Sequence, residues 1–256
     1  MMLKDKVCIV TGGDRGLGFA AAKRFVEEGG IVFVCNRNEE SGKAAVEKLK
    51  AIGGEAFWIK TDVSKEEDVK NYVDTAMEKY GRIDVLFNNA GIEGTVAPTG
   101  EYPIADFDKI FSINLRGTFM GMHYVLPIMQ KQGKGRIINT SSIGGLVGHP
   151  NFAGYCATKF GVIGATKAAA LEYSKFGISI NAICPGATNT EMIQNAAVKA
   201  YPDDPQKYYD FVASLLPIGR MGEPYEIGNL VCFLASDQAP FLTGAAIAID
   251  GCQTAI

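Results

Sequence analysis

The fold of this 256-residue chain is decided by one stretch near its beginning, Val7-Cys8-Ile9-Val10-Thr11-Gly12-Gly13-Asp14-Arg15-Gly16-Leu17-Gly18. The apolar run at its start predicts a buried strand, and the glycines predict a tight turn into a helix. Glycines at such a turn let the backbone approach a pyrophosphate closely, while the helix N-terminus supplies unpaired N–H groups and a partial positive charge. The stretch therefore predicts a dinucleotide site, whose expected contacts in the turn are Gly12, Asp14, Arg15, Gly16, Leu17 and Gly18.

The rest of the chain alternates short β-branched runs with longer amphipathic segments, which is typical of a parallel sheet with helices on both faces. We expect strands at about 6–10, 31–36, 55–60, 83–87, 136–140, 178–183 and 245–249. We expect helices near 16–28, 39–52, 65–80, 104–131, 152–175 and 223–235. With no repeat, low-complexity tract or linker, the chain is expected to form one α/β domain over residues 1–256. Its predicted fold is a Rossmann-type, doubly wound parallel sheet of about seven strands.

Residues 187–222 depart from this alternation. They follow the sixth expected strand and combine apolar and aromatic residues with the break Pro202-Asp203-Asp204-Pro205. A long insertion beyond the carboxyl end of a strand lies on the ligand side of an open sheet. We expect a substrate lid here, formed by small helices that pack on the body of the domain.

Composition excludes several classes of function. The net charge of -3 gives no electrostatic case for binding nucleic acid or an anionic membrane, and no apolar run approaches the ~20 residues of a membrane span. The six cysteines are scattered and mostly lie in apolar runs, which suits a reducing cytoplasm. The two histidines, His123 and His149, have no Cys or His cluster around them, so no metal site is expected. The first six residues, Met-Met-Leu-Lys-Asp-Lys, run directly into the first expected strand, so no signal peptide is expected.

Tyr155 and Lys159 form the most informative pair of polar residues. A tyrosine hydroxyl titrates near pH ~10, which makes it a poor proton donor or acceptor at neutral pH. An ammonium held close to it favours the phenolate and lowers its pKa. Positions i and i+4 of a helix share one face, so the segment Tyr155-x-x-x-Lys159 brings an acid and its tuning charge together. As an isolated pair, the two would more often be a half-buried ring and a solvated amine.

Six motifs occur in register: Thr11-Gly-x-x-x-Gly-x-Gly18, Asn88-Asn-Ala-Gly91, Asn114, Ser142, Tyr155-x-x-x-Lys159, and Pro185-Gly186 with Thr190. On these motifs the whole chain resembles the short-chain dehydrogenase/reductase family. Within the family it is most similar to the cyclic-ketone and hydroxysteroid dehydrogenases typified by levodione reductase. Three segments carry this closer likeness: Asn88-Asn-Ala-Gly-Ile-Glu-Gly94, Ser112-Ile-Asn-Leu-Arg-Gly117 and Ile249-Asp-Gly-Cys-Gln-Thr-Ala255.

The resemblance implies an oxidoreductase that moves a hydride between a nicotinamide cofactor and a carbonyl carbon. Tyr155 would donate the proton, Ser142 would hydrogen-bond the reacting oxygen, and Lys159 would lower the Tyr155 pKa and hold the nicotinamide ribose. Asn114, in the long helix 104–131, would anchor a water of the proton relay. The family pattern also implies further cofactor contacts at Asp62, Val63, Asn89, Ala90, Gly91, Pro185, Gly186, Thr188 and Thr190.

Each residue also has an ordinary structural interpretation. Ser142 could form a turn, Asn114 could be a buried helix polar group, and Thr190 could cap a helix. Thr140 and Ser141 are expected to be structural, and His149 to be exposed in its loop. It is their joint spacing that favours the catalytic interpretation.

The choice of cofactor depends on the end of the second strand. An acidic residue there binds the adenosine ribose hydroxyls, whereas a basic one accommodates a 2′-phosphate. Asn36 stands where NAD-using relatives carry Asp, and Arg37 follows it. Arg15 adds a second cation, while Asp14 would repel a phosphate. These residues favour NADP(H), with NAD(H) as the alternative.

The expected pocket walls are 93–100, 143–149, Ala187 and the lid, and they are mostly apolar. They predict an uncharged, hydrophobic ketone or secondary alcohol, alicyclic or steroid-like. The alternative is a 3-oxoacyl-[acyl-carrier-protein] reductase, although Leu171 stands where those enzymes usually carry Arg. A non-catalytic cofactor-binding regulator would be expected to lack Tyr155, Lys159 or Ser142, all of which are present.

Members of the family like this one generally pair through long helices, here 104–131 and 152–175. Small residues within Phe160–Leu171 would allow close helix contact. We therefore expect a homotetramer.

Overall fold

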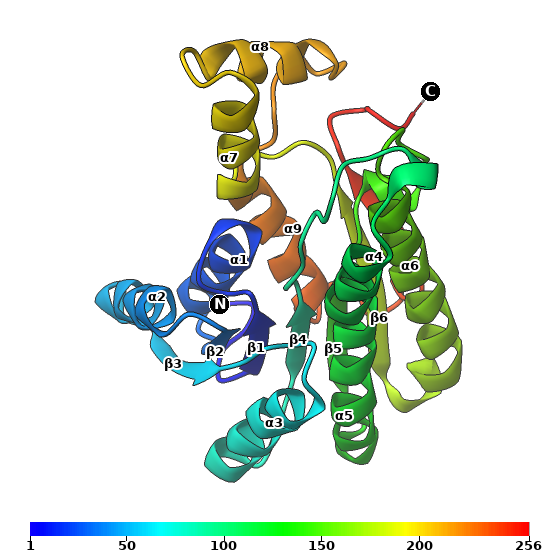
Figure 1. Ribbon diagram of the computed structural model, residues 1–256. Coiled ribbons are helices and arrows are strands. Elements are labelled where there is room, and N and C mark those ends of the chain that lie inside the picture. Colours follow the sequence, from blue (N-terminus) through cyan, green and yellow to red (C-terminus); the bar gives the residue numbers. More distant parts are fainter. Residues whose placement is uncertain (256) are drawn as a thin grey trace.

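The computed structural model describes residues 1–255 and contains a seven-stranded sheet in the order β3-β2-β1-β4-β5-β6-β7 (Figure 1). Each pair of neighbouring strands is parallel. The strands are β1 Val7–Thr11, β2 Ile31–Asn36, β3 Glu55–Lys60, β4 Val85–Asn88, β5 Gly135–Thr140, β6 Ile178–Pro185 and β7 Ala246–Ile249. The predicted doubly wound α/β fold is confirmed, and every expected strand is present within about two residues of its expected bounds.

Helices connect the strands and cover both faces of the sheet. They are α1 Gly16–Glu27, α2 Glu39–Ala51, α3 Glu66–Tyr80, α4 Ile104–Phe111, α5 Gly117–Gln132, α6 Ala153–Tyr173, α7 Glu191–Ala200, α8 Gln206–Ser214 and α9 Pro224–Ala235. Three short 3₁₀ segments, η1 Thr99–Glu101, η3 Ile143–Gly145 and η4 Ser174–Phe176, complete them. The α1, α2 and α9 helices pack on one face, and α3, α5 and α6 pack on the other.

The packing of β1 on both faces of the sheet explains why its sequence is continuously apolar. Cys8 and Val10 join the core beneath α1, α2 and α9, whereas Val7 and Ile9 join the core beneath α3, α5 and α6. Successive side chains of a strand point to opposite faces, so a strand covered on both faces needs an apolar residue at every position.

The expected helix 104–131 is one continuous helical run with a change of pitch inside it. Between α4 and α5 lies a five-residue π-helical segment, η2 Ser112–Arg116, which contains Asn114. A π-helical turn accommodates an extra residue and is often found at functional sites. The expected helix over 104–131 is thus present, and the π-helical turn inside it is a detail that the sequence did not indicate.

Residues 187–222 contain α7 and α8, which contact each other and stand out from the body at the top of Figure 1. An isolated parallel bridge between Thr188 and Gly222 joins the two ends of this segment. The segment thus leaves and rejoins the domain at one place, beside the carboxyl end of β6. Within residues 1–255 no helix combines the length and apolar character needed to cross a membrane.

Candidate active site

The carboxyl ends of the central strands open into a cleft with a volume of about 940 Å³. The strand order reverses direction between β1 and β4, which is where open α/β sheets bind ligands. The predicted residues that line the cleft are Gly12, Asp14, Arg15, Gly16, Leu17, Asn36, Arg37, Asp62, Val63, Asn89, Ala90, Gly91, Ser142, Tyr155, Lys159, Pro185, Gly186, Thr188 and Thr190. Gly18 and Asn114 do not line it and lie behind it.

The glycine turn has the geometry that a phosphate site needs. Gly12 and Gly16 have φ of 61° and 52°, a region that favours glycine. A Cβ on Gly18 would lie 2.0 Å from the carbonyl oxygen of Gly12, so Gly18 lets the helix pack against the turn. No side chain caps the N-terminus of α1. Its first N–H groups are therefore free to bind an anion.

The loop after β4 is tied to the glycine turn by side-chain hydrogen bonds. The Thr11 hydroxyl accepts hydrogen bonds from the backbone N–H groups of Asn89 and Ala90, at 2.9 and 3.0 Å. The Asn89 side-chain amide donates to the carbonyl oxygens of Thr11 and Gly12, at 3.1 and 3.2 Å. These bonds fix the position of the loop after β4 relative to the glycine turn, and both segments are predicted from the sequence to bind the cofactor.

At the end of the cleft where adenosine is expected, both polar atoms of the Asn36 side chain form hydrogen bonds. Its oxygen accepts from Trp58 Nε1 at 2.8 Å, and its nitrogen donates to Asn38 O and Ser41 Oγ at 2.8 and 3.2 Å. Ser41 in turn donates to Asp14 Oδ2 at 2.8 Å. Asn36 therefore organises this corner of the cleft, a role that the sequence did not indicate because Trp58 and Ser41 lie on other elements.

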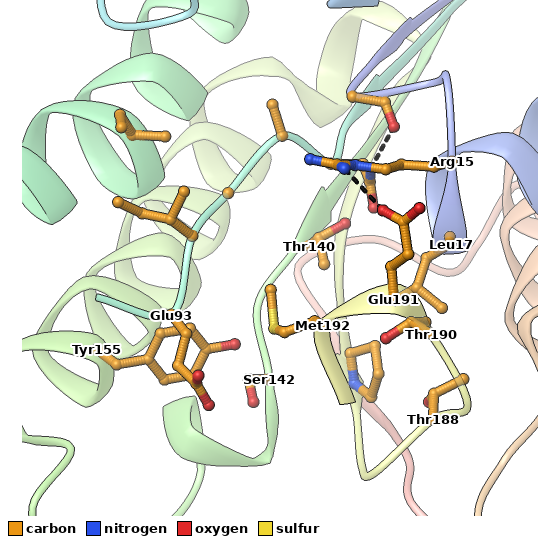
Figure 2. Close-up of a pocket in the computed structure, with 18 of the residues that line it drawn as sticks. Arg15, Leu17, Glu93, Thr140, Ser142, Tyr155, Thr188, Thr190, Glu191 and Met192 are labelled. Carbon is orange, nitrogen blue, oxygen red and sulfur yellow. Dashed lines mark hydrogen bonds and ion pairs between the residues drawn. The ribbon is translucent and has the colours of Figure 1, made fainter. Parts of the chain in front are cut away.

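The two arginines that favoured a 2′-phosphate differ in their contacts. Arg37 is exposed, lines the cleft and forms no side-chain hydrogen bond or ion pair with any of residues 1–255. Arg15 is paired instead with Glu191 at the start of α7, with 2.7 Å between Nη1 and Oε2 (Figure 2). Arg15 thus lines the cleft as expected but is paired with a carboxylate of the lid segment, and its contribution to binding a 2′-phosphate stays a prediction.

Tyr155 and Lys159 both line the cleft from α6. Lys159 Nζ lies 5.5 Å from the centre of the Tyr155 ring and donates to the carbonyl oxygen of Thr140 at 2.9 Å. Figure 2 shows the Tyr155 and Ser142 hydroxyls at the same end of the cleft. The side chains expected to act on the reacting oxygen are thus brought together.

The electrostatics of this pair differ from the expectation. Burial raises the pKa of Tyr155 to about 12, an effect that Ser142 partly opposes and that the charge of Glu93 reinforces. Burial also lowers the pKa of Lys159 to about 8. The predicted lowering of the tyrosine pKa is not found, because loss of water disfavours the charged forms of both groups.

Asn114 binds the backbone beside Tyr155 and Lys159. Its side-chain oxygen accepts from Ile92 N at 2.9 Å, and its nitrogen donates to Ile92 O at 2.8 Å and to Thr158 Oγ1 at 3.3 Å. A Cβ on Gly91 would lie 3.2 Å from Asn114 Oδ1 and 3.7 Å from Lys159 Nζ. Asn114 thus fixes the backbone beside Lys159, and its predicted role in a water relay stays a prediction.

Buried side-chain atoms without a hydrogen-bond partner concentrate at the cleft. Within residues 1–255 these atoms are Tyr72 Oη, Thr140 Oγ1, His149 Nε2 and Gln253 Oε1, and all but Tyr72 belong to residues that line the cleft. Buried polar groups normally have partners, so this concentration fits a polar ligand. The expectation that His149 is merely exposed was wrong, because its loop folds over the cleft.

The ordinary structural interpretation does not hold for Thr190, whereas Ser142 does form the expected turn contact. Thr190 occupies the N-cap position of α7, yet its side chain makes no capping hydrogen bond, so its hydroxyl remains free. Ser142 Oγ accepts from Gly144 N at 3.1 Å. This bond uses a lone pair and leaves the hydroxyl proton available to a ligand oxygen.

A family model described as enoyl-(acyl carrier protein) reductase matches residues 12–254. The chain is a short-chain dehydrogenase/reductase. Levodione reductase from Leifsonia aquatica is 44% identical over 254 residues, which cover 98% of this chain and 95% of that protein. The crystal structure of levodione reductase matches with a TM-score of 0.95 and 42% identity over 99% of both chains.

Two further relatives bear on the chemistry. Cyclohexanol dehydrogenase from Acinetobacter sp. (strain SE19) is 39% identical over 250 residues, or 98% of this chain and 95% of that protein. The crystal structure of a point variant of actinorhodin polyketide ketoreductase with NADPH matches with a TM-score of 0.92 and 35% identity over 97% of both chains. The predicted family is confirmed, and the protein is an NAD(P)-dependent oxidoreductase that interconverts alcohols and ketones.

Part of the cleft of this dehydrogenase/reductase is apolar. The large apolar side chains that line the cleft include Ile92, Ile113, Ile143, Phe152, Met192 and Ile193. Glu93 is the exception, since it lines the same part of the cleft and its carboxyl group lies near Tyr155 in Figure 2. The sequence placed residue 93 in a pocket wall without indicating that a carboxylate would face the site.

Proposed function

We propose that this enzyme interconverts an uncharged, hydrophobic cyclic ketone and its secondary alcohol, with NADP(H) as the preferred cofactor. The observation that carries the proposal is the single cleft in which Tyr155, Ser142 and Lys159 lie beside apolar walls and next to the glycine turn. The names of two relatives, levodione reductase and cyclohexanol dehydrogenase, support an alicyclic substrate.

In the reductive direction, the Tyr155 hydroxyl donates its proton to the carbonyl oxygen of the substrate. The Ser142 hydroxyl donates a hydrogen bond to the same oxygen and stabilises the negative charge that develops on it. A bound nicotinamide supplies the hydride for the carbonyl carbon. A phenol whose pKa is raised to about 12 keeps its proton at neutral pH but is a weak acid, so proton transfer from it requires stabilisation of the phenolate.

Lys159 and Asn114 support this chemistry indirectly, through charge and through the position of the backbone. When protonated, Lys159 places a positive charge close to the tyrosine ring and favours the phenolate formed after proton transfer. Asn114 holds the Ile92 backbone, which continues the segment along the cofactor. We assign all four residues to the catalytic machinery, as the family resemblance predicts.

The cleft suits an extended dinucleotide. The uncapped N-terminus of α1 would hold the pyrophosphate, and Asp62 with Val63 would hold the adenine. Thr188, Thr190 and the backbone at Pro185–Gly186 would surround the nicotinamide, where the free Thr190 hydroxyl can meet a carboxamide. Asn89, Ala90 and Gly91 would run along the riboses and phosphates.

The preference for NADP(H) rests on Arg37, an exposed cation of the cleft that forms no ion pair among the residues described, although its charge acts on the nearby Asp62. Asp14 opposes it, so NAD(H) would be used less efficiently. Replacing Arg37 by leucine should raise the KM for NADPH about tenfold or more, since a charge-assisted phosphate contact is lost. The KM for NADH should change much less, and equal effects on both cofactors would contradict the preference.

The proposed substrate class is tested with purified enzyme, NADPH or NADH, and a panel of cyclic ketones, diketones, hydroxysteroids and acetoacetyl thioesters. Consumption of reduced cofactor with cyclic ketones is the expected result. Turnover of the thioesters alone would favour the 3-oxoacyl-[acyl-carrier-protein] reductase. Cofactor binding without turnover of any compound would favour a regulator.

We also propose a homotetramer in a reducing cytoplasm. Large apolar side chains are exposed along the helices expected to pair, namely Ile104, Phe111, Phe119, Phe160 and Leu171. The six cysteines carry free thiols, which fits a reducing compartment. Equilibrium sedimentation giving the mass of one chain would contradict the assembly.

A further inference from the structure

Glu93 is a carboxylate that the mechanism above does not use. Its side chain is half-buried, lines the cleft and forms no hydrogen bond or ion pair with any residue in the range 1–255. Its charge acts on Tyr155 and also on Tyr208 of α8, so it faces both the catalytic tyrosine and the lid segment. Burial raises its own pKa, and Lys199 of α7 partly opposes this.

The backbone on both sides of Glu93 is fixed. Asn114 binds the N–H and the carbonyl of Ile92. Gly94 has φ of 78°, and a Cβ there would lie 2.8 Å from both Ile110 Cδ1 and Tyr102 Oη. Thr95 N donates to Tyr102 Oη at 3.3 Å. The direction of the Glu93 side chain is therefore set by its surroundings, and the cleft is where it points (Figure 2).

Glu93 is only half-buried, so water can solvate its carboxylate in the open cleft, and a substrate that displaces this water must supply a hydrogen-bond donor in its place. The cleft residues Ile92, Ile143 and Phe152 have no side-chain donor, and the donors that line the cleft, such as Ser142 and Tyr155, form no hydrogen bond with Glu93 in this structure. A hydroxyl group on the substrate would meet this need, because hydrogen bonds to a charged acceptor are stronger than neutral ones. Its position would then be fixed relative to the carbonyl oxygen held by Tyr155 and Ser142.

Resting on the function proposed above, we infer that Glu93 determines the substrate class of this site. Its carboxylate accepts a hydrogen bond from a ring hydroxyl of the substrate while Tyr155 and Ser142 hold the reacting oxygen. The preferred substrates are therefore hydroxylated cyclic ketones in the reductive direction, and the corresponding cyclic diols in the oxidative one.

The test compares hydroxy- and methylcyclohexanones substituted at the same ring carbon, because the two substituents have similar size. In the native enzyme, kcat/KM for the best hydroxy isomer should exceed that of its methyl partner by about tenfold to a hundredfold, the range for a hydrogen bond to a charged group. Glu93→Leu should reduce this ratio to about one or below. Glu93→Gln should give an intermediate ratio, because its amide oxygen still accepts a neutral hydrogen bond.

A binding measurement accompanies the kinetics. Both enzymes carry Tyr155→Phe for this measurement, so that with oxidised cofactor present neither the carbonyl nor the ring hydroxyl of the hydroxy ketone reacts during the titration. Titration calorimetry should then give a dissociation constant about tenfold or more higher when Glu93→Leu is added. The affinity of each variant for cofactor alone reports that its site is folded.

Three results would overturn the inference. The first is an equal kcat/KM for both substituents in the native enzyme, and the second is a ratio that survives in Glu93→Leu. The third is an equal loss on both substrates, reproduced by Lys199→Met, which would make Glu93 a contact for the lid segment. If no cyclic ketone is reduced at all, the proposed function fails first and this inference falls with it.

Discussion

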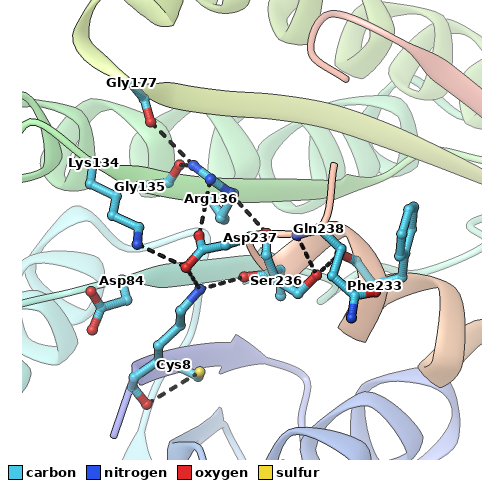
Figure 3. Close-up of polar contacts among 12 residues, drawn as sticks. Cys8, Asp84, Lys134, Gly135, Arg136, Gly177, Phe233, Ser236, Asp237 and Gln238 are labelled. Carbon is cyan, nitrogen blue, oxygen red and sulfur yellow. Dashed lines mark hydrogen bonds and ion pairs between the residues drawn. The ribbon is translucent and has the colours of Figure 1, made fainter. Parts of the chain in front are cut away.

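Buried charges at the two ends of the strands have different environments. The amino edge is the side of the sheet where the strands begin, and the carboxyl edge is the side where they end. At the amino edge, Lys6 and Arg136 are nearly inaccessible to solvent, and both reach the carboxylate of Asp237, at 3.1 Å each. Figure 3 shows Arg136 and Asp237. Arg136 also donates to three backbone carbonyl oxygens. At the carboxyl edge, Lys159 is equally buried but has one backbone carbonyl and no carboxylate as a hydrogen-bonding partner among the residues described.

The difference follows from what each edge does. Charges that are paired and hydrogen-bonded can lie inside a protein without a large penalty. Charges and hydroxyls left without partners cost stability, and they remain available to a ligand. Stability should therefore depend on the amino edge and chemistry on the carboxyl edge, which can be tested one substitution at a time.

The largest effect should come from Tyr155→Phe at the carboxyl edge. Loss of the proton donor should lower kcat by about 10²–10⁴-fold, the range for a positioned general acid. The melting temperature should stay the same or rise slightly, because a buried hydroxyl leaves. Tyr173→Phe is the matched control, since Tyr173 lies on the same helix outside the cleft. Near-native turnover of Tyr155→Phe would refute the assignment of this residue.

The converse substitution is Arg136→Met at the amino edge. It removes the guanidinium donor from three carbonyl oxygens and from Asp237 Oδ1, while Asp237 Oδ2 keeps Lys6 and Lys134. The free energy of unfolding should therefore fall by about 3 kcal/mol in chemical denaturation. Steady-state kcat and KM should be unchanged below the melting temperature.

Lys50→Met provides the control for the loss of a cation. The Lys50–Glu47 pair, at 3.3 Å, is exposed, so its loss should change stability by no more than about 0.5 kcal/mol. If Arg136→Met were as stable as this control, the amino-edge cluster would not be stabilising, and the contrast between the edges would disappear.

The same contrast explains what the sequence could and could not predict. The strands and the glycine turn were predictable because their signals are local: an apolar run, then glycines, then a helix. The motif spacing also predicted that Ser142, Tyr155 and Lys159 share one cleft, as they do. These features depend on residues close together in the chain or on a pattern shared with the family.

Features that depend on which side chains face one another were not predictable. The Asn36–Trp58 bond joins two strands, and the Arg15–Glu191 pair joins residues far apart in the chain. The pKa direction of Tyr155 was wrong for the same reason, because burial, unlike an i and i+4 spacing, cannot be read from the sequence. The π-helical turn at Asn114 leaves no periodic signal either, since it adds one residue to an otherwise helical pattern.

A third prediction concerns the pH dependence of stability that Lys159 causes. Its pKa is 10.5 without burial and about 8 in the fold. Below pH 8 both the folded and the unfolded chain hold the proton, and the fold carries the cost of a buried ammonium. Between pH 8 and 10.5 the unfolded chain binds more protons, so this contribution makes stability rise with pH.

Lys159→Met should remove that contribution. At about pH 7 the variant should be more stable than the native enzyme by about 2 kcal/mol, and the difference should shrink as pH rises from 8 to 10.5. Urea unfolding at several pH values measures the difference, which cancels the titration of other groups. A variant that is less stable at neutral pH would mean that the ammonium is compensated in the fold.

The smallest effect is expected for Glu191→Gln, which removes the ion pair between the lid segment and the glycine turn. This pair lies at the carboxyl edge but its side chains are 67% and 55% exposed. Exposed pairs are worth little and are screened by salt. The melting temperature should move by about one degree at most, as in the control Glu47→Gln, whose partner Lys50 is also exposed.

The KM for NADPH separates the two variants. Arg15 released from Glu191 can turn toward the cofactor phosphates, so the KM should fall by up to about threefold at low salt and return to the native value near about 0.5 M salt. Glu47→Gln should leave it unchanged. A change of about tenfold or more that persists at high salt would show that this pair, although exposed, governs how the lid segment sits on the cleft.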